Sequence, residues 1–411
     1  MKHEKLAKYA ELIVKAGVNL QPGQTLVLSS PIESAPFARM VAETAYKHGA
    51  REVVMNWNDE LSKKIKYVKA PTEIFDEFPE WMKDFYLFYS RGGAAFVSIY
   101  AEDPELMKEV EPDRIMRAQK AANSAIKEHR ERLMSNYNAW NVVSVPTVSW
   151  AKKVFPEMTE SEAVEALWEA ILAAVRVDTP DPVAAWKAHK ETLEKTIHWL
   201  NSKQFRQLHY QNSLGTDLTV TLPEGHLWTG GAEVTQQGID FIANMPTEEV
   251  FTLPYKNGVN GHVVSSMPLQ YNGKLIENFS LTFRDGKIVD YTAENGFESL
   301  KGLIETDEGS HYLGEVALVP YDSPISNAGI LYYNTLFDEN ASCHFAIGKA
   351  YPVCLKNGAE MNKSELEAAG VNDSLVHEDF MIGTPDLEIM GITSSGEKIP
   401  VFKNGNFAVS F

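Results

Sequence analysis

The stretch T-L-F-D-E-N-A-S-C-H-F-A-I-G-K-A-Y, residues 335–351, brings several reactive side chains together within a short segment. Asn340 is a residue type that caps helices, because its side-chain oxygen accepts a hydrogen bond from a free N–H of the first turn. We therefore expect a helix that begins at the next residue. On such a helix His344, Gly348 and Tyr351 share one face, since residues three and four positions apart lie above one another.

The chemistry of this stretch favours a metal site. Asp338 and Glu339 precede the expected cap, and Ala341 and Gly348 leave room beside the imidazole of His344. An imidazole, a phenol and carboxylates over little more than two helical turns are what metal-assisted hydrolysis requires. The alternative is a helix whose histidine and tyrosine are ordinary core residues, and on this stretch alone the two interpretations carry equal weight.

The composition is that of a globular protein with an acidic surface. Hydrophobic residues make up 44% of the 411 residues and charged residues 23%, as in ordinary soluble domains. At ~150 residues per domain, this length predicts two or three domains. The formal net charge of −18 argues against nucleic acid or an anionic membrane as a partner, because binding to phosphate requires a basic surface.

Cysteine usage and the first residues indicate the compartment. The chain has two cysteines, Cys343 and Cys354, which is fewer than a disulfide scaffold of this length would carry and favours a reducing environment. The opening M-K-H-E-K-L-A-K-Y-A-E-L lacks the apolar core of a signal peptide, and no apolar run approaches the ~20 residues needed to span a bilayer. We therefore expect a cytoplasmic protein.

The N-terminal half alternates between helical and extended patterns. Apolar residues at helical spacing run to Gly17 and again from Ser34 to His48, and an apolar strand follows each helix. Helix, strand, helix, strand at this spacing predicts a parallel sheet with helices packed on it. The strands are expected at residues 25–28, 51–57, 94–100 and 140–145, with a long polar helix near 112–136.

Two further helices, at residues 161–177 and 181–204, extend this α/β domain. After Phe205, short alternating runs are separated by turns such as N-S-L-G, N-G-K and R-D-G-K, which suit antiparallel hairpins. We therefore expect an α/β domain over residues 1–204 and a mainly antiparallel, β-rich catalytic domain over residues 205–411. No glycine-rich phosphate loop follows a predicted strand, so the α/β half is interpreted as a scaffold or substrate platform.

Three more segments of the β-rich half carry carboxylates or imidazoles in apolar surroundings. In N-M-P-T-E-E-V-F-T-L-P, an extended chain points Glu248 and Glu249 to opposite faces, so that one of them faces inward. In G-E-V-A-L-V-P, Glu315 lies on an apolar strand, and a buried carboxylate requires a partner such as a cation. In L-V-H-E-D-F-M-I-G, strand alternation puts His377 and Asp379 on one face, where they can clamp a metal.

Each of these signals is weak alone, but together they put three carboxylates and two imidazoles in one domain. Mixed nitrogen and oxygen ligands suit Zn²⁺, Co²⁺ or Mn²⁺ better than an all-oxygen Mg²⁺ or Ca²⁺ site. Five ligands are one too many for a single tetrahedral zinc with an open position, so the set favours two ions that share a carboxylate and a water. We expect two divalent ions per chain, zinc, cobalt or manganese, with magnesium as a further option.

The same segments resemble a known family. N-M-P-T-E-E-V-F-T, G-E-V-A-L-V-P, the opening stretch and H-E-D-F-M-I-G follow the order found in the aminopeptidase T and aminopeptidase S metallopeptidases, and I-V-K-A-G-V-N-L-Q-P-G-Q extends the likeness over nearly the whole chain. The resemblance implies a homodimeric, leucyl-type aminopeptidase with a pair of metal ions. It also implies a role for Tyr351 near the metals. The implied metal ligands are Glu249, Glu315, His344, His377 and Asp379.

The expected reaction is the release of N-terminal residues from peptides by a water that two metal ions activate. Glu339 is the candidate proton shuttle, with a ligand role or a supporting role as alternatives, and Tyr351 is the candidate donor to the oxyanion. Phe251, Phe345 and Met381 are candidates for the pocket of the first side chain, although an ordinary core position is the weightier interpretation for each.

Two rival functions use the same ligand set. A metal-dependent phosphoesterase or amidohydrolase also uses paired ions, but the acidic charge and the lack of an Arg/Lys cluster near the motifs weigh against phosphorylated substrates. A non-catalytic α/β binding protein with a closed, structural metal site is the third alternative.

Overall fold

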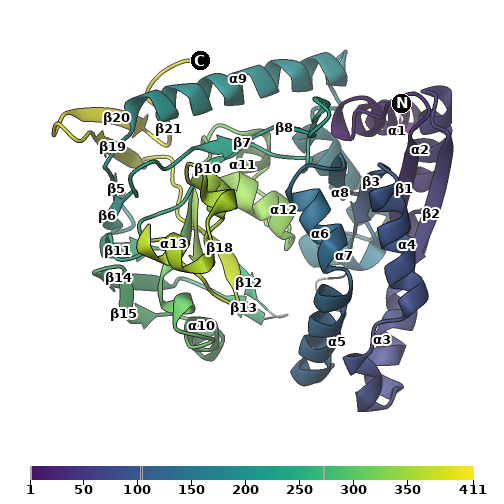
Figure 1. The fold of residues 1–411 in the computed structure, drawn as a ribbon, viewed down its shortest axis with the longest axis horizontal. Helices are drawn as coiled ribbons and strands as arrows, with labels where there is room; N and C mark the ends of the chain where they lie inside the picture. Colours follow the sequence, from purple (N-terminus) through teal and green to yellow (C-terminus); the bar gives the residue numbers. More distant parts are fainter. Residues whose placement is uncertain (1, 102, 104, 272–273) are drawn as a thin grey trace. The chain divides into compact units, whose positions relative to one another are not determined.

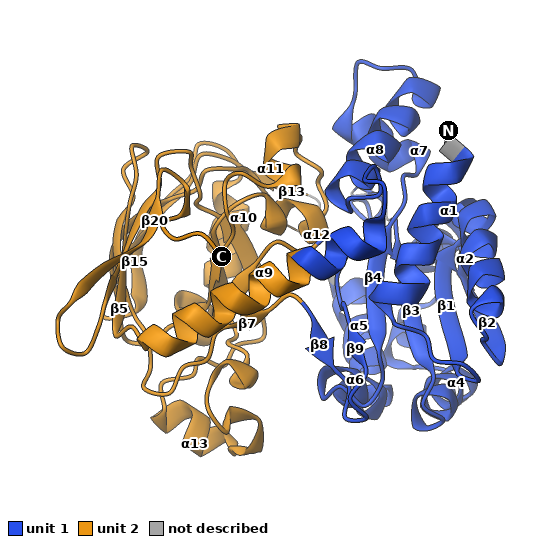
Figure 2. Cartoon of the chain, turned by 90° about the horizontal axis from the view of Figure 1, so that it is seen from above, with its two compact units in different colours: residues 1–188, 232–246 blue, residues 189–231, 247–411 orange. Residues whose placement is uncertain are grey.

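The computed structural model describes residues 2–101, 103, 105–271 and 274–411. It divides into two compact units (Figure 2). Unit 1 comprises residues 1–188 and 232–246, and unit 2 comprises residues 189–231 and 247–411. The chain passes from unit 1 to unit 2 inside one helix, returns for a short segment and then goes back. The sequence analysis instead put its boundary at Gln204, directly after that helix, and kept 232–246 with the C-terminal half.

Unit 1 is built on a four-stranded parallel sheet with the strand order β2-β1-β3-β4. Each strand overlaps a segment for which the sequence predicted one, so the expected parallel sheet is confirmed. The returning segment adds to its edge, because the N–H of Val142 donates to the carbonyl oxygen of Ala243 at 2.7 Å. The strands are β1 Thr25–Pro31, β2 Glu52–Asn58, β3 Ala95–Tyr100 and β4 Trp140–Ser144 (Figure 1).

Helices complete unit 1. Aromatic side chains join α1, α2 and α8, since the ring of Phe37 stacks on Tyr9 at 5.2 Å and meets Trp168 edge-on at 5.8 Å between centroids. The polar helix predicted near 112–136 is two helices, with a break at residue 126. The helices are α1 Lys2–Leu12, α2 Ala35–Lys47, α3 Glu60–Lys69, α4 Glu80–Arg91, α5 Pro112–Ala125, α6 Lys127–Met134, α7 Val148–Val154 and α8 Glu160–Ala174. The helix that passes from unit 1 into unit 2 is α9 Pro182–Lys203. The short strands β8 Glu233–Val234 and β9 Asp240–Phe241 lie in the returning segment.

Unit 2 contains two larger antiparallel sheets, which confirms the β-rich, mainly antiparallel character predicted for the C-terminal half. One sheet has five strands in the order β18-β17-β16-β10-β7. These strands are β7 Thr229–Gly230, β10 Val250–Thr252, β16 Leu313–Leu318, β17 His344–Gly348 and β18 His377–Met381.

The other large sheet has eight strands in the order β15-β14-β11-β6-β5-β19-β20-β21. They are β5 Gln207–Gln211, β6 Asp217–Thr221, β11 Val259–Val264, β14 Ser280–Arg284, β15 Lys287–Thr292, β19 Glu388–Ile392, β20 Lys398–Lys403 and β21 Asn406–Phe407. A small hairpin pairs β12 Leu269–Tyr271 with β13 Lys274–Ile276. Unit 2 also has the short helices α10 Phe297–Ile304, α11 Pro324–Ala328, α12 Thr335–Asp338 and α13 Lys363–Ala368.

The hydrophobic core of unit 2 draws on both large sheets. Tyr210 of β5 packs edge-on against Phe345 of β17, with 5.0 Å between ring centroids. Ile347 of β17 and Phe380 of β18 belong to the same cluster of buried side chains. Because side chains alternate along a strand, one face of the five-stranded sheet belongs to this core and its other face is left for polar side chains.

The prediction of a helix that begins at Ala341 is wrong. α12 ends at Asp338, a single 3₁₀ turn covers Glu339–Ala341, and residues His344–Gly348 form strand β17. The physical reason is that β16 and β18 pair with β17 on both sides, so its backbone is satisfied in a ladder and its side chains are buried on both faces. Asn340 is not the cap; Asn334 caps α12 by accepting from the N–H of Leu336.

None of the helices in the described part of the chain is both long and apolar enough to cross a membrane.

Candidate metal centre

Neighbouring strands of the five-stranded sheet carry the five predicted ligands. Glu249 directly precedes β10, Glu315 lies on β16, and His344 begins β17. His377 and Asp379 share a face of β18, as strand alternation predicted. The neighbours of these ligands on β17 and β18 point into the core, so the ligands project from the opposite face of the sheet.

The first cluster consists of Glu249, Glu315 and His344. Nε2 of His344 lies 3.2 Å from Oε2 of Glu249 and 3.6 Å from Oε1 of Glu315. One ligand atom from each of the three residues falls within 4.8 Å of the others, a spacing that fits one ion.

The second cluster consists of Glu315, His377 and Asp379. Nε2 of His377 lies 3.5 Å from Oε2 of Glu315 and 3.5 Å from Oδ1 of Asp379. These three residues meet the same spacing as the first cluster. Glu315 therefore belongs to both clusters and turns a different carboxylate oxygen toward each histidine.

Backbone carbonyls fix the orientation of both imidazoles. Nδ1 of His344 lies 3.1 Å from the carbonyl oxygen of Ser342, and Nδ1 of His377 lies 2.7 Å from that of Lys349. A carbonyl oxygen only accepts, so each Nδ1 carries a proton and each Nε2 is the ring nitrogen that faces the carboxylates. Once Nε2 has given up its own proton to bind a metal, this is the tautomer that a histidine ligand requires.

The electrostatics of the cluster fit a cation. Burial raises the pKa of Glu315 to about 7, the carboxylates of Asp379 and Glu249 add to the rise, and the hydrogen bond with His344 opposes it. Burial lowers the pKa of His344, but its hydrogen bonds with Glu249 and Glu315 outweigh that effect and raise it above the ordinary value. Oδ1 of Asp379 is buried and makes no hydrogen bond to the described residues. Clustered carboxylates with an orphaned oxygen are the donor set that a divalent ion satisfies.

Two glycines permit the close backbone approach that orients His377. A Cβ at Gly348, whose φ is +107°, would lie 2.2 Å from the carbonyl oxygen of Val376. A Cβ at Gly314 would lie 2.3 Å from the carbonyl oxygen of Lys349, the group that accepts from His377. Only glycine fits at both positions. The sequence analysis treated Gly348 as room beside His344, whereas its role in the structure is this approach of β18.

Asn340 connects the candidate proton shuttle to the ligand segment, a role that the sequence analysis missed. Its side-chain oxygen accepts from the N–H of Glu248 at 2.7 Å, and its Nδ2 donates to the carbonyl oxygen of Leu336 and to Oε1 of Glu339 at 3.4 Å. Asn340 is fully buried. Burial raises the pKa of Glu339 well above its ordinary value, and the carboxylates of Glu249 and Asp379 add to the rise.

His189 also contacts the segment that carries Glu248 and Glu249. Its Nε2 lies 2.8 Å from the carbonyl oxygen of Thr247 and 3.5 Å from Oε2 of the buried Glu248. Glu248 is thus the residue of the Glu-Glu pair that faces inward, and Glu249 is left for the cluster. The contacts of Asn340 with Glu248 and of His189 with Thr247 join residues far apart in the sequence, so no local pattern predicts them.

Tyr351 lies beside the second cluster. Its ring centroid is 4.6 Å from that of His377 and 6.3 Å from that of Phe251. Burial raises the pKa of its hydroxyl, and the carboxylates of Glu315 and Asp379 add to the rise, so the phenol stays protonated and can donate. Phe345 is a core residue and takes no part in the site, while Met381 lines a pocket next to it.

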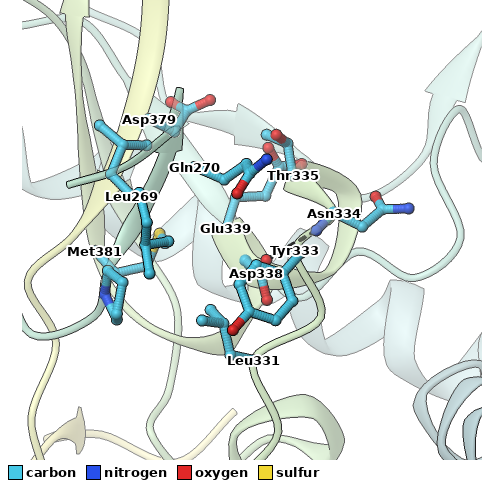
Figure 3. Close-up of a pocket in the computed structure, with 12 residues that line it drawn as sticks. Leu269, Gln270, Leu331, Tyr333, Asn334, Thr335, Asp338, Glu339, Asp379 and Met381 are labelled. Carbon is cyan, nitrogen blue, oxygen red and sulfur yellow. Dashed lines mark hydrogen bonds between the residues drawn. The ribbon is translucent and has the colours of Figure 1, made fainter. Parts of the chain in front are cut away.

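That pocket opens beside the cluster within unit 2. Figure 3 shows Asp379 near one end of it and Leu331 near the other, with Glu339 between them. Its lining is drawn from three parts of the unit: the β12–β13 hairpin, the loop and helix around α12, and β18. The lining residues are Pro268, Leu269, Gln270, Leu275, Leu331, Tyr333, Asn334, Thr335, Asp338, Glu339, Asp379 and Met381.

Comparisons with known proteins agree with a hydrolytic metal site. Residues 2–407 match the family model described as thermophilic metalloprotease (M29). The chain is 51% identical to Aminopeptidase 2 of Geobacillus stearothermophilus and 49% identical to Aminopeptidase AmpS of Bacillus subtilis, in each case over 98% of both chains. The solved structure of wild-type AmpT from Thermus thermophilus superposes with a TM-score of 0.93 at 39% identity, over 100% of both chains. The chain therefore belongs to the M29 family of metalloproteases.

Proposed function

We propose that this protein is an aminopeptidase that releases N-terminal residues from peptides with the help of two divalent metal ions. The observation that carries the proposal is the carboxylate of Glu315, which turns one oxygen toward each of two histidine-containing clusters. The family match and the names of the relatives support the peptidase activity. We propose zinc, cobalt or manganese as the ions, because the ligands combine imidazole nitrogen with carboxylate oxygen.

Glu249, Glu315 and His344 would hold one ion, and Glu315, His377 and Asp379 the other. When bound, the ions supply Lewis-acid chemistry, which polarises a peptide carbonyl and makes a water molecule more acidic. The carbonyl oxygens of Ser342 and Lys349 keep both imidazoles in the required tautomer.

Glu339 and Tyr351 would handle the proton and the developing charge. Burial, together with the charges of Glu249 and Asp379, raises the pKa of Glu339 and so makes its carboxylate a stronger base. That carboxylate would take the proton of the attacking water and return it to the leaving amine. The protonated hydroxyl of Tyr351, next to His377, would donate a hydrogen bond to the oxyanion of the tetrahedral intermediate.

A substrate panel with metal removal tests the proposal. The purified protein is expected to hydrolyse leucine p-nitroanilide, to lose that activity in a chelator, and to regain it with Zn²⁺, Co²⁺ or Mn²⁺. N-acetyl-leucine p-nitroanilide, which lacks the free amine, is expected to remain intact. Turnover of the acetylated substrate, turnover of p-nitrophenyl phosphate instead, or full activity after the metal is removed would each contradict the proposal.

We also propose that the protein is a homodimer. Leu61, Ile65 and Val68 lie on one face of α3 and are 63%, 62% and 43% exposed, and α3 buries none of its residues. An apolar stripe of this kind on a surface helix marks an interaction surface, and a second copy of the chain is the simplest partner. Light scattering is expected to give a dimer for the wild type and a monomer for Leu61→Glu with Ile65→Glu. Lys66→Glu on the same helix is the control and is expected to stay dimeric.

A cytoplasmic location is the corresponding proposal for the compartment. Both cysteines, Cys343 and Cys354, are free and buried, which suits a reducing environment. Fractionation of the source cells tests it, and recovery of the protein outside the cytoplasmic fraction would contradict it.

A further inference from the structure

One face of the parallel sheet in unit 1 is covered up to the carboxyl ends of β1, β3 and β4. Leu28, Ile99 and Val143 lie on this face, toward the ends of their strands, and all three are buried. Both faces of a parallel sheet are normally covered in this way, because crossover helices pack on each of them. The opposite face of this sheet departs from that rule.

On the opposite face the cover ends partway along the strands. Side chains of α4 and α6 pack against Val27 and Phe96 in the amino-terminal half. Two positions further along, Ser29 is only half-buried and Ser98, on the interior strand β3, is exposed. The register of the sheet puts Ser29 between Asn56 of β2 and Ser98. The uncovered part of the face therefore carries a polar row that consists of Asn56, Ser29 and Ser98.

The polar row lies where open α/β sheets bind their ligands. The chain adds β2 on one side of β1 and β3 on the other, so the topological switch point falls between β1 and β3. Ser29 and Ser98 are register partners across that point, toward the carboxyl ends of both strands. Ligands of open α/β sheets bind at the carboxyl ends of the strands, at such a switch point. The position thus predicts a ligand, and the side chains indicate its chemistry.

The polar row and its neighbours have hydrogen-bonding groups to offer. Nδ2 of Asn56 donates to Oγ of Ser29 at 3.0 Å and to the hydroxyl of Tyr86 at 3.4 Å. Within the described part of the chain, Oδ1 of Asn56 and Oγ of Ser98 make no hydrogen bond. The ring of Tyr86 packs against His129, whose Nδ1 is buried and has no hydrogen-bond partner among the described residues. A buried polar atom without a partner is unfavourable, and a donor on a ligand would satisfy it.

The charges near the polar row favour a neutral ligand over an anion. The row itself consists of uncharged amide and hydroxyl groups. The first charged residue that the structure describes after each of β1, β2 and β3 is acidic, and these residues are Glu33, Asp59 and Asp103. Phosphate or carboxylate groups would be repelled there. A peptide group is neutral and has one donor and one acceptor, which match a side-chain amide oxygen and a hydroxyl.

We propose that Asn56, Ser29 and Ser98 bind the backbone of an extended peptide. Neighbouring strands lie about 4.8 Å apart, so the row spans about 10 Å, the length of about three extended residues. The choice of a peptide over another neutral ligand, such as a sugar, rests on the proposed aminopeptidase function. The five candidate metal ligands all belong to unit 2, so the polar row is a separate peptide site.

Binding of an uncleavable peptide to the holoenzyme tests the proposal. The probe is an N-acetylated octapeptide of glycine, serine and leucine with a fluorophore on its C-terminal amide, which lacks the free amine that an aminopeptidase requires. Fluorescence anisotropy is expected to show saturable binding that persists after the metal is chelated. Ser98→Trp, which fills the uncovered face, is expected to raise Kd about tenfold or more. Asn56→Ala, which removes the amide, is expected to raise it about 2- to 10-fold.

Ser161→Trp is the matched control, because Ser161 is an exposed serine on α8, outside the polar row, and its Kd is expected to equal that of the wild type. Melting temperatures show which variants fold, and Asn56→Ala decides if Ser98→Trp does not. A wild-type Kd in every row variant that folds would overturn the inference. Loss of all peptide binding with the metal, or binding of maltoheptaose in place of the peptide, would overturn it too. A protein that binds the peptide in this way but does not hydrolyse leucine p-nitroanilide would instead contradict the proposed function.

Discussion

The side-chain oxygen of Asn340 accepts a hydrogen bond from the backbone N–H of Glu248 at 2.7 Å. This contact ties the 3₁₀ turn that carries Glu339 to the segment that carries Glu249, although the two are far apart in the sequence. The Nδ2 of the same amide faces Oε1 of Glu339. One buried side chain thus holds the candidate proton shuttle in register with a candidate ligand.

Asn340→Asp is expected to lower kcat for leucine p-nitroanilide. The variant keeps the oxygen that accepts from Glu248 but faces Glu339 with a second carboxylate in place of a donor. A hydrogen bond to a charged group contributes about 1.5–3 kcal/mol, which corresponds to a roughly 10- to 100-fold loss of rate. An Asn340→Asp protein with wild-type kcat would show that Asn340 does not orient Glu339.

Loss of Glu315 is expected to remove both ions, because its two oxygens face different clusters. Metal analysis after dialysis should give about two ions per chain for the wild type and far less than one for Glu315→Ala. Glu378→Gln is the control, since Glu378 lies between His377 and Asp379 on β18 and alternation turns it to the opposite face. Equal metal contents in Glu315→Ala and the wild type would contradict the shared-carboxylate arrangement.

Tyr351→Phe is expected to lower kcat by about 10²-fold with little change in KM, because an oxyanion donor acts in the transition state and not on the bound substrate. The substitution keeps the ring that packs beside His377. Steady-state kinetics with leucine p-nitroanilide measures kcat and KM separately and so checks this expectation. A rise in KM at constant kcat would move Tyr351 from the reaction to substrate binding.

Gly348→Ala is expected to destabilise the protein and to weaken metal binding. The new Cβ would lie 2.2 Å from the carbonyl oxygen of Val376, at a φ of +107°, so β18 and its ligand His377 must shift. Strain at such a position costs on the order of 1–3 kcal/mol. Gly302→Ala is a control of opposite sign, because Gly302 lies in α10 with open space around it, and alanine there is expected to raise the melting temperature. A Gly348→Ala protein with wild-type melting temperature would contradict the steric argument.

The folded protein is expected to lose stability in acid because of His129, whose ring packs against those of Tyr86 and Phe96. Burial, with smaller contributions from the charges of Arg130 and Arg132, lowers its pKa from the ordinary 6.5 to about 4. The unfolded chain therefore takes up a proton at a pH where the folded chain does not. Stability from this residue is complete above pH 6.5 and is lost as the pH falls toward 4, by on the order of 2 kcal/mol.

His129→Phe isolates this contribution, because phenylalanine does not titrate and matches the aromatic surroundings. Melting temperatures at pH 7 and pH 4.5 are the measurement, and the variant is expected to lose less between them than the wild type. Identical losses would show that His129 is protonated in the folded state or is not buried in solution.

The parallel sheet of unit 1 could be predicted because its strands are long apolar runs that alternate with amphipathic helices. β17 was mistaken for a helix because His344 and Gly348 are four residues apart, and that spacing shares a face in a helix and in a strand alike. The ligand groups could be recognised one segment at a time. Their supports, Asn340, His189 and the carbonyl of Lys349, could not, since each acts through contacts between segments that no local pattern encodes.

Glu315 sits on the middle strand of the five-stranded sheet, and its neighbours β10, β17 and β18 carry or adjoin the other candidate ligands. Ions held there would link four strands through their side chains, in addition to the backbone hydrogen bonds of the sheet, and would stabilise the folded state in which the ligands are together. Amide hydrogen exchange should then slow in β10, β16, β17 and β18 when metal is added. In the eight-stranded sheet, which carries none of the five ligands, exchange should keep its metal-free rate.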